Sequence, residues 1–149
     1  FKSEVFKLPE HFIMPDVAVV PGTDGQKMSK SYGNVIPLFA SREVLAKAVM
    51  GLVTDSSGDR PENVYAIHKL VKSEEELAPL YEANKGSYKA LKEALIEDLD
   101  SYLAPMRAKY EELKNNPSIV EEVLARGKQE AREVSEKKME EVRRAIGVG

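Results

Sequence analysis

Most of this chain repeats its apolar residues at steps of three and four, the spacing that places side chains on one face of an α-helix. The repeat is longest over 88–113, where it covers about seven turns and is interrupted only by Pro105. A second long repeat follows the turn 114–118 and ends at Gly147, a residue that commonly terminates helices. We therefore expect two long antiparallel helices, the first of them bent, in a helical bundle.

Three shorter helices are expected before the long pair. Ser41 is placed to cap the first of them, and Pro61 suits the first turn of the second. Ser73 and Glu76 have the spacing of a capping box at the start of the third helix, which Pro79 should kink or shorten. The residues expected to face inward are Leu45, Ala48, Val49, Leu52, Val64, Ile67, Leu70, Val71, Leu77, Leu80 and Tyr81.

The beginning of the chain has a different pattern. The apolar run 17–20 is short and is bounded by Pro15-Asp16 and Pro21-Gly22, which is typical of a buried strand. Such a strand normally belongs to a parallel sheet covered on both faces, and one strand is not a sheet. The expected fold class is therefore mainly α, a helical bundle over 41–149 preceded by a short α/β remnant over 1–40.

The composition excludes several classes of protein. The 149 residues include no Cys, which excludes disulfides and Cys-based metal sites and is compatible with a cytoplasmic protein. No apolar run approaches the ~20 residues needed to cross a bilayer, so no membrane role is expected. The net charge of −3 argues against a polycation that binds nucleic acid nonspecifically. His11 and His68 are single and far apart, and we assign them no catalytic or metal role.

A polar loop, 21–34, lies between the expected strand and the first helix, and it combines glycines and hydroxyls with two lysines. Glycine lets the backbone turn sharply and approach a ligand, and lysine is a flexible point charge that can follow phosphate oxygens. Lys27 and Lys30, together with Ser29 and Ser31, therefore suit a polyphosphate ligand. Composition alone would also fit an ordinary solvated loop.

Residues 27–31 of this loop read Lys-Met-Ser-Lys-Ser, which reproduces the KMSKS signature of class I aminoacyl-tRNA synthetases. Further segments along nearly the whole chain resemble the tryptophanyl branch of that class. These segments are 22–26, 31–36, 53–56, 88–92, 104–107, 127–132 and 142–147. The chain departs from the branch at Gly86-Ser87-Tyr88, where members often have Gly-Tyr-Gly.

The resemblance implies an enzyme that activates tryptophan with ATP and transfers it to tRNA-Trp. It assigns 1–40 to the end of a Rossmann catalytic domain with the KMSKS loop, and 41–149 to a helical domain that binds the tRNA anticodon. Mg²⁺ would be held mainly by the ATP phosphates, and the parent protein would be a homodimer. The tryptophan pocket would lie in an amino-terminal half that this chain does not contain, so the chain alone is expected to be inactive.

The resemblance also implies roles for individual residues. Lys30 and Lys27 would be catalytic, binding the β- and γ-phosphates and offsetting charge on the departing pyrophosphate. Met28 would be an apolar anchor for the loop, and Asn34 is expected to cap the following helix rather than bind a ligand. The predicted ATP-binding residues are Lys27, Met28, Ser29, Lys30, Ser31, Ala18 and Val19. No metal-binding residue is predicted.

Cations of the helical domain are the candidates for tRNA binding. They are Arg107, Lys109, Arg126, Lys128 and Arg132, with Lys137, Lys138, Arg143 and Arg144 as further ones. A solvated helix surface competes with this interpretation, because Glu133 with Lys137, and Glu140 with Arg144, have the spacing of surface ion pairs. Two alternatives stay open for the function of the chain: the tyrosyl branch of the same class, and a non-catalytic helical module that binds RNA or protein.

Overall fold

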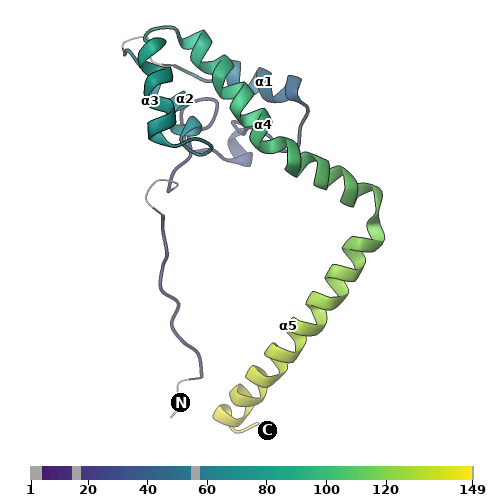
Figure 1. Cartoon of the computed structure of the whole chain (residues 1–149). Helices are drawn as coiled ribbons and strands as arrows, with labels where there is room; N and C mark the ends of the chain where they lie inside the picture. Colours follow the sequence, from purple (N-terminus) through teal and green to yellow (C-terminus); the bar gives the residue numbers. More distant parts are fainter. Residues whose placement is uncertain (1–4, 15–17, 55–57, 149) are drawn as a thin grey trace. The chain divides into compact units, whose positions relative to one another are not determined.

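The computed structural model describes residues 5–14, 18–54 and 58–148 of the chain. Within these ranges the chain forms five α-helices and a short 3-10 helix, with no strand, so the mainly α fold class is confirmed. The elements are η2 (Lys30–Tyr32), α1 (Arg42–Met50), α2 (Glu62–His68), α3 (Glu74–Ala83), α4 (Tyr88–Asn115) and α5 (Pro117–Ile146). Figure 1 labels the five α-helices.

The helices belong to two compact units. Ile13–Tyr110 forms the first unit, which contains α1, α2, α3 and most of α4. Phe1–Phe12 and Glu111–Gly149 form the second unit, which contains the end of α4 and all of α5. The domain boundary expected between residues 40 and 41 stays a prediction.

The core of the first unit joins α1, α2 and α4. Leu45 and Val49 of α1 pack with Val64 of α2 and Leu95 of α4, and all four side chains are fully buried. Burial of a side chain of this size stabilises the fold by about 1.5–3 kcal/mol, so these contacts fix the three helices against one another. The same cluster contains Ile36, Leu52, Ile67, Ile96, Leu99 and Leu103, and a second cluster contains Leu77, Tyr81 and Leu91.

The inward faces expected for the short helices are confirmed except at one position. Leu70 is 38% exposed, because α2 ends at His68 and the helical spacing no longer applies beyond it. Pro79 lies inside α3 and does not shorten it, since the helix continues to Ala83. Pro79 is exposed, so water can reach the carbonyl that loses its backbone donor at this position.

Lys92 of α4 is a buried cation whose burial the apolar repeat did not predict. Lys92 is 8% exposed, and its Nζ donates to the carbonyl of Met50 at 3.0 Å and to that of Leu52 at 2.6 Å. The carbonyl of Met50 lies at the end of α1, where a helix leaves acceptors without intrahelical partners, and Leu52 lies two residues beyond the helix. Burial lowers the pKa of Lys92 from its ordinary value. Lys92 therefore connects α4 to the last turn of α1.

The buried strand expected over 17–20 is not formed in the described part of that segment. Ala18 is exposed and Val19 is 62% exposed, while Val17 lies outside the described residues. A strand is stable only when its backbone groups pair with a neighbouring strand. The isolated bridge found here joins Pro21 to Lys27 and offers Val19 no partner. The apolar pattern of a strand is present, but the sheet that would bury it is not part of the described chain.

The second unit is dominated by α5, which confirms the second long repeat. Gly147 follows the helix with a φ of 77°, the left-handed conformation expected of a glycine that ends a helix. Among the described residues of α5 none is buried, and Val123, Leu124 and Val134 are all more than half exposed. The apolar face of α5 is therefore not buried by the other described residues of this unit. Lys138 of α5 donates a hydrogen bond through Nζ to the carbonyl of Val5, at 3.1 Å.

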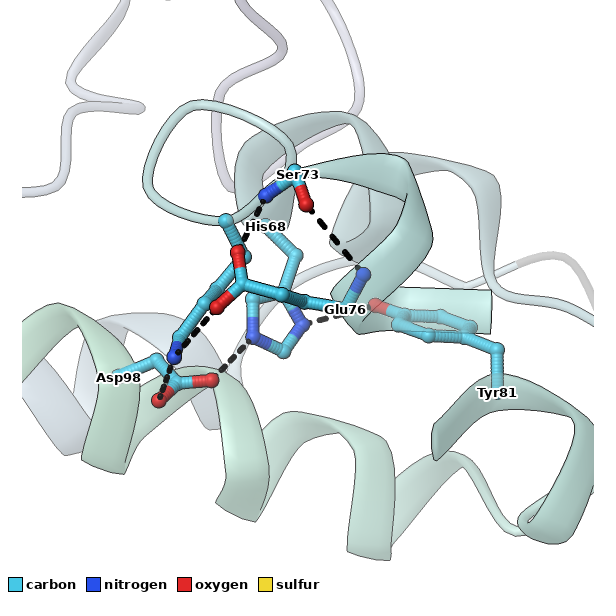
Figure 2. Close-up of polar contacts among 6 residues, drawn as sticks. His68, Ser73, Glu76, Tyr81 and Asp98 are labelled. Carbon is cyan, nitrogen blue, oxygen red and sulfur yellow. Dashed lines mark hydrogen bonds and ion pairs between the residues drawn. The ribbon is translucent and has the colours of Figure 1, made fainter. Parts of the chain in front are cut away.

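A buried histidine connects three helices of the first unit, as Figure 2 shows. His68, at the end of α2, is fully buried. Its Nδ1 lies 3.2 Å from the hydroxyl of Tyr81 on α3, and its Nε2 lies 2.9 Å from Oδ2 of Asp98 on α4. The spacing of residues in the sequence did not reveal that His68 lies in the core.

Candidate phosphate-binding loop

The signature loop begins with a tight turn closed by its own backbone. The amide of Gly22 donates to the carbonyl of Gln26 at 2.6 Å, and the amide of Gly25 donates to the carbonyl of Gly22 at 3.0 Å. Gly25 has a φ of 80°, a conformation that glycine adopts without strain. A Cβ at Gly25 would also come within 2.8 Å of the side-chain amide of Asn63. The backbone conformation therefore favours glycine at this position, and any other residue would also require the Asn63 side chain to shift.

The second half of the loop is the 3-10 turn η2. Ser29 precedes it, and Gly33 ends it with a φ of 68°. The hydroxyls of Ser29 and Ser31 lie 2.7 Å apart, so both can be aimed at one ligand oxygen or at each other. Lys27 and Lys30 are exposed, and no carboxylate of the described residues forms an ion pair with either. The loop thus presents two available ammonium groups and two hydroxyls.

One apolar residue attaches the loop to the core. Met28 is partly buried and packs against the cluster formed by α1, α2 and α4. Its amide donates to the carbonyl of Val20 at 2.8 Å. Packing against the core is the contact expected of an apolar anchor. Met28 thus faces inward, whereas Lys27 before it and Lys30 after it are exposed.

The structure corrects the role expected for Asn34. Asn34 does not cap the following helix, because α1 begins only at Arg42 and Ser41 occupies the cap position. Asn34 is instead 2% exposed inside the loop. Its Nδ2 donates to Oδ1 of Asp24 at 2.7 Å and to the carbonyl of Lys27 at 3.2 Å, and its Oδ1 accepts from the amide of Ser29 at 2.8 Å. An asparagine before a helix is typical of a cap. Only the burial of Asn34 and its hydrogen bonds reveal that it holds the loop together.

The carboxylate of Asp24 completes this arrangement. It accepts from Asn34 and from the amide of Gln26, the latter at 3.0 Å. The hydrogen bond from Asn34 is the largest cause that lowers the pKa of Asp24 from its ordinary value. Asp24 is therefore ionised at neutral pH, with neutral amide donors bound to Oδ1.

A chain of hydrogen bonds connects the loop to α2. The amide of Thr23 donates to the carbonyl of Asn34 at 2.9 Å, and the carbonyl of Thr23 accepts from the amide of Val53 at 2.9 Å. The carbonyl of Val53 in turn accepts from the side chain of Asn63, near the start of α2, at 3.0 Å. The loop is therefore held by the helical residues that follow it as well as by its own turn.

Three of the tRNA candidates on the helices, Arg107, Arg126 and Arg132, have intramolecular acidic partners. Arg107 bonds through Nη2 to the carbonyl and the carboxylate of Asp100, and its side chain is only 19% exposed. Arg126 pairs with Glu130 at 3.9 Å and Arg132 with Glu136 at 3.6 Å, each as an i,i+4 pair on α5. Lys109 and Lys128 are exposed on α4 and α5.

The surface ion pairs expected on α5 are found in part. Glu140 and Arg144 form the expected pair at 3.8 Å. Glu133 instead accepts a hydrogen bond from Gln129, at 2.7 Å. Exposed pairs of this kind contribute little to stability, so they leave the cations free to exchange partners.

Two further properties concern the described residues alone. They contain no group of three or more His, Cys, Asp or Glu side chains that could hold a metal ion. Their helices include none that is both long enough and apolar enough to span a bilayer.

A glycine-held turn that presents two available lysines, followed by a helical unit, is typical of loops that can bind phosphate groups. The family model described as tRNA synthetases class I (W and Y) matches residues 1–146. The chain therefore belongs to this family, the class I tRNA synthetases.

Curated relatives are similar over almost the whole chain. The chain is 38% identical to the tryptophan–tRNA ligase of Fusobacterium nucleatum over 153 residues, covering 97% of this chain and 47% of that protein. It is 39% identical to the tryptophan–tRNA ligase of Campylobacter jejuni strain RM1221 over 155 residues, covering 98% of this chain and 49% of that protein. The chain thus spans about half the length of the curated relatives it matches.

A solved structure supports the same family. The fold is similar to the crystal structure of the tryptophanyl-tRNA synthetase from Campylobacter jejuni complexed with ADP and tryptophan, with a TM-score of 0.79 and 37% sequence identity. The match covers 96% of this chain and 48% of that chain. Sequence and fold therefore agree on the family.

Proposed function

We propose that this chain is the carboxy-terminal part of a tryptophan–tRNA ligase, which activates tryptophan with ATP and transfers it to tRNA-Trp. The observation that carries the proposal is the exposure of Lys27 and Lys30 on a loop that is otherwise anchored by Met28 and Asn34. The tryptophan–tRNA ligases among its relatives, and the one crystallised with ADP and tryptophan, support this choice of substrates.

The loop acts in the first step of the proposed reaction. The tryptophan carboxylate attacks the α-phosphate of ATP, and pyrophosphate leaves with growing negative charge. Ammonium groups already in place stabilise that charge more than they stabilise bound ATP, which accelerates the step. Lys27 and Lys30 supply these groups, and Ser29 and Ser31 add hydroxyl donors. Mg²⁺ enters the proposal as an ion carried by the phosphates of ATP.

The remaining parts of the proposal concern the other substrates. Residues 1–40 complete the catalytic domain, where the exposed backbone at Ala18 and Val19 contacts adenine, and 41–149 binds tRNA-Trp. Lys128 is a stronger tRNA candidate than Arg107, because Asp100 already holds the Arg107 guanidinium. The tryptophan pocket lies outside this chain, and the complete ligase is a homodimer in the cytoplasm.

Replacement of Lys30 tests the role of the loop. Lys30→Ala in the complete ligase should lower the maximal rate of adenylate formation about a hundredfold while changing the ATP requirement much less. Lys30→Arg should recover part of the rate, because the planar guanidinium reaches phosphate oxygens differently from a compact ammonium. The measurement is single-turnover formation of tryptophanyl-adenylate at saturating tryptophan with ATP varied.

Lys47→Ala is the matched control, since Lys47 is an exposed lysine of α1 outside the signature loop. It should leave both the rate and the ATP requirement unchanged. A Lys30→Ala variant that keeps its maximal rate and only needs more ATP would show that Lys30 binds the ground state and does not act on the reaction.

The amino acid dependence of pyrophosphate exchange separates the proposal from its alternatives. Exchange by the complete ligase that depends on tryptophan supports the proposal, whereas dependence on tyrosine assigns the chain to the tyrosyl branch. Absence of exchange with either amino acid favours a non-catalytic helical module that binds RNA or protein.

A further inference from the structure

We propose that Asn34 and Asp24 form a latch that holds the signature loop in the pose from which Lys27 and Lys30 reach the phosphates. Both are positioning residues in this inference, because they act on the loop and do not touch the nucleotide. The inference rests on the proposed function for its catalytic consequence, although the latch itself is a property of the loop.

The side chain of Asn34 bonds to three separate points of the loop. These are the carboxylate of Asp24, the carbonyl of Lys27 and the amide of Ser29, at 2.7, 3.2 and 2.8 Å. A carboxylate requires a donor and a backbone amide requires an acceptor, so these partners fix the orientation of the Asn34 amide group. An acid, an amide of the wrong length or an apolar residue could not satisfy all three together.

Asn34 is tightly packed inside the loop. Asn34 is 2% exposed, and Gly22 lies directly against it. A Cβ on Gly22 would lie 2.4 Å from the side-chain amide of Asn34, closer than real contacts allow. A buried amide that lost its partners would be costly, so the closed arrangement of the loop is favoured over an open one.

The bonds of Asn34 lie on both sides of Met28, within the segment that carries the lysines. The carbonyl of Lys27 and the amide of Ser29 are both held, and Met28 between them packs against the core. The backbone of these three residues is therefore fixed, while the lysine side chains stay exposed. Without the latch this backbone would have to be ordered when ATP binds or reacts, which would slow the reaction.

Asp24 contributes the other half of the latch. Its Oδ1 accepts from Asn34 and from the amide of Gln26, which closes the turn that precedes Lys27. Since Asn34 and Gln26 are neutral donors, Asp24 is held without using either lysine as a counterion.

The test measures loop order and catalysis separately in the complete ligase. Asn34→Ala should raise amide hydrogen exchange in a peptide covering 28–31 about tenfold and lower single-turnover adenylate formation about tenfold or more. Asn34→Asp should be more damaging, because it places two carboxylates at hydrogen-bond distance. Adding Asp24→Asn to Asn34→Asp restores a donor and an acceptor between these positions, and it should recover part of both effects.

Gln26→Ala is the control, since Gln26 is an exposed residue of the same turn whose backbone takes part in the latch. It should change neither exchange nor rate. Melting temperature identifies a variant that fails to fold, and Asp24→Ala at the exposed end of the latch then provides the loss-of-contact variant.

Two results would overturn the inference. One is unchanged exchange over 28–31 in the folded loss-of-contact variant. The other is recovery of neither exchange nor rate in the Asp24→Asn, Asn34→Asp double variant relative to Asn34→Asp. Failure of the proposed function would look different: the unmodified ligase would form no tryptophanyl-adenylate, while the exchange measurement would still report on the latch.

Discussion

Two side chains at the start of α3 replace the hydrogen bonds that a helix end lacks. The hydroxyl of Ser73 accepts from the amide of Glu76 at 3.3 Å, and the carboxylate of Glu76 accepts from the amide of Ser73 at 2.9 Å. This reciprocal pair is the capping box that the spacing of the two residues predicted. The hydrogen bond from the Ser73 backbone is the largest cause that lowers the pKa of Glu76 from its ordinary value of 4.5.

We predict that Ser73→Ala lowers the free energy of unfolding by about 1 kcal/mol, because an amide of the first turn loses its acceptor. Urea denaturation at neutral pH measures the change. Ser101→Ala, at an exposed position inside α4, is the control and should change stability little. An equal effect of both substitutions would contradict the role of the cap.

The same site predicts a pH dependence. Because the folded pKa of Glu76 is lowered, its ionised form stabilises the fold above pH 4.5, and this contribution is lost as the pH falls through the lowered pKa. Glu76→Gln should therefore reduce stability at neutral pH and have less effect in acid. Thermal melting of both proteins from pH 7 to pH 3 tests this, and a difference that does not vary with pH would contradict it.

At the scale of elements, α2, α3 and α4 are joined by polar groups as well as by apolar packing. When the imidazole of His68 is neutral, Nε2 donates to the carboxylate of Asp98, and Nδ1 then accepts from the hydroxyl of Tyr81. Burial raises the pKa of Tyr81, which keeps that hydroxyl protonated and able to donate. The two hydrogen bonds of His68 drawn in Figure 2 then run in one direction, from Tyr81 to Asp98.

We predict that Asp98→Ala lowers the free energy of unfolding by about 1–3 kcal/mol, because it leaves the buried N–H of His68 without an acceptor. The cost should shrink in a His68→Leu background, where no buried donor is left unsatisfied. Glu93→Ala is the control, since Glu93 is an exposed acid of the same helix. Equal costs of Asp98→Ala in the two backgrounds would show that the hydrogen bond does not contribute.

At the scale of the whole molecule, the chain contains one part of the proposed active site. The signature loop is organised within Ile13–Tyr110, with Met28 attached to the core of that unit. Val19, which is expected to lie near adenine, is 62% exposed. The chain also spans only about half the length of its curated relatives.

We predict that the purified 149-residue chain forms no tryptophanyl-adenylate. The loop supplies cations, but holding ATP and tryptophan in line is what makes the attack fast. Pyrophosphate exchange with tryptophan should not exceed that of a Lys27→Ala, Lys30→Ala double variant. Exchange above this background would show that the chain binds both substrates by itself.

The helices were predictable because their information is local. Apolar residues spaced at steps of three and four predicted α4 and α5. The spacing of Ser73 and Glu76 predicted the start of α3, and Gly147 predicted the end of α5. Each of these signals depends on neighbours within one or two turns. The strand expected over 17–20 is not formed in its described part, because a strand needs a partner that its own residues do not specify.

The sequence by itself determined the helical architecture, the family and the loop that carries Lys27 and Lys30, because periodicity and a contiguous signature are local properties. Only the tertiary structure decided which polar side chains are buried and what they bind. Asn34, His68 and Lys92 look like ordinary polar residues in the sequence, and each acquires its partners from residues distant in the chain or in a loop closed by folding. Burial of a polar group is tolerated only when such partners are in place, and that condition is met in three dimensions.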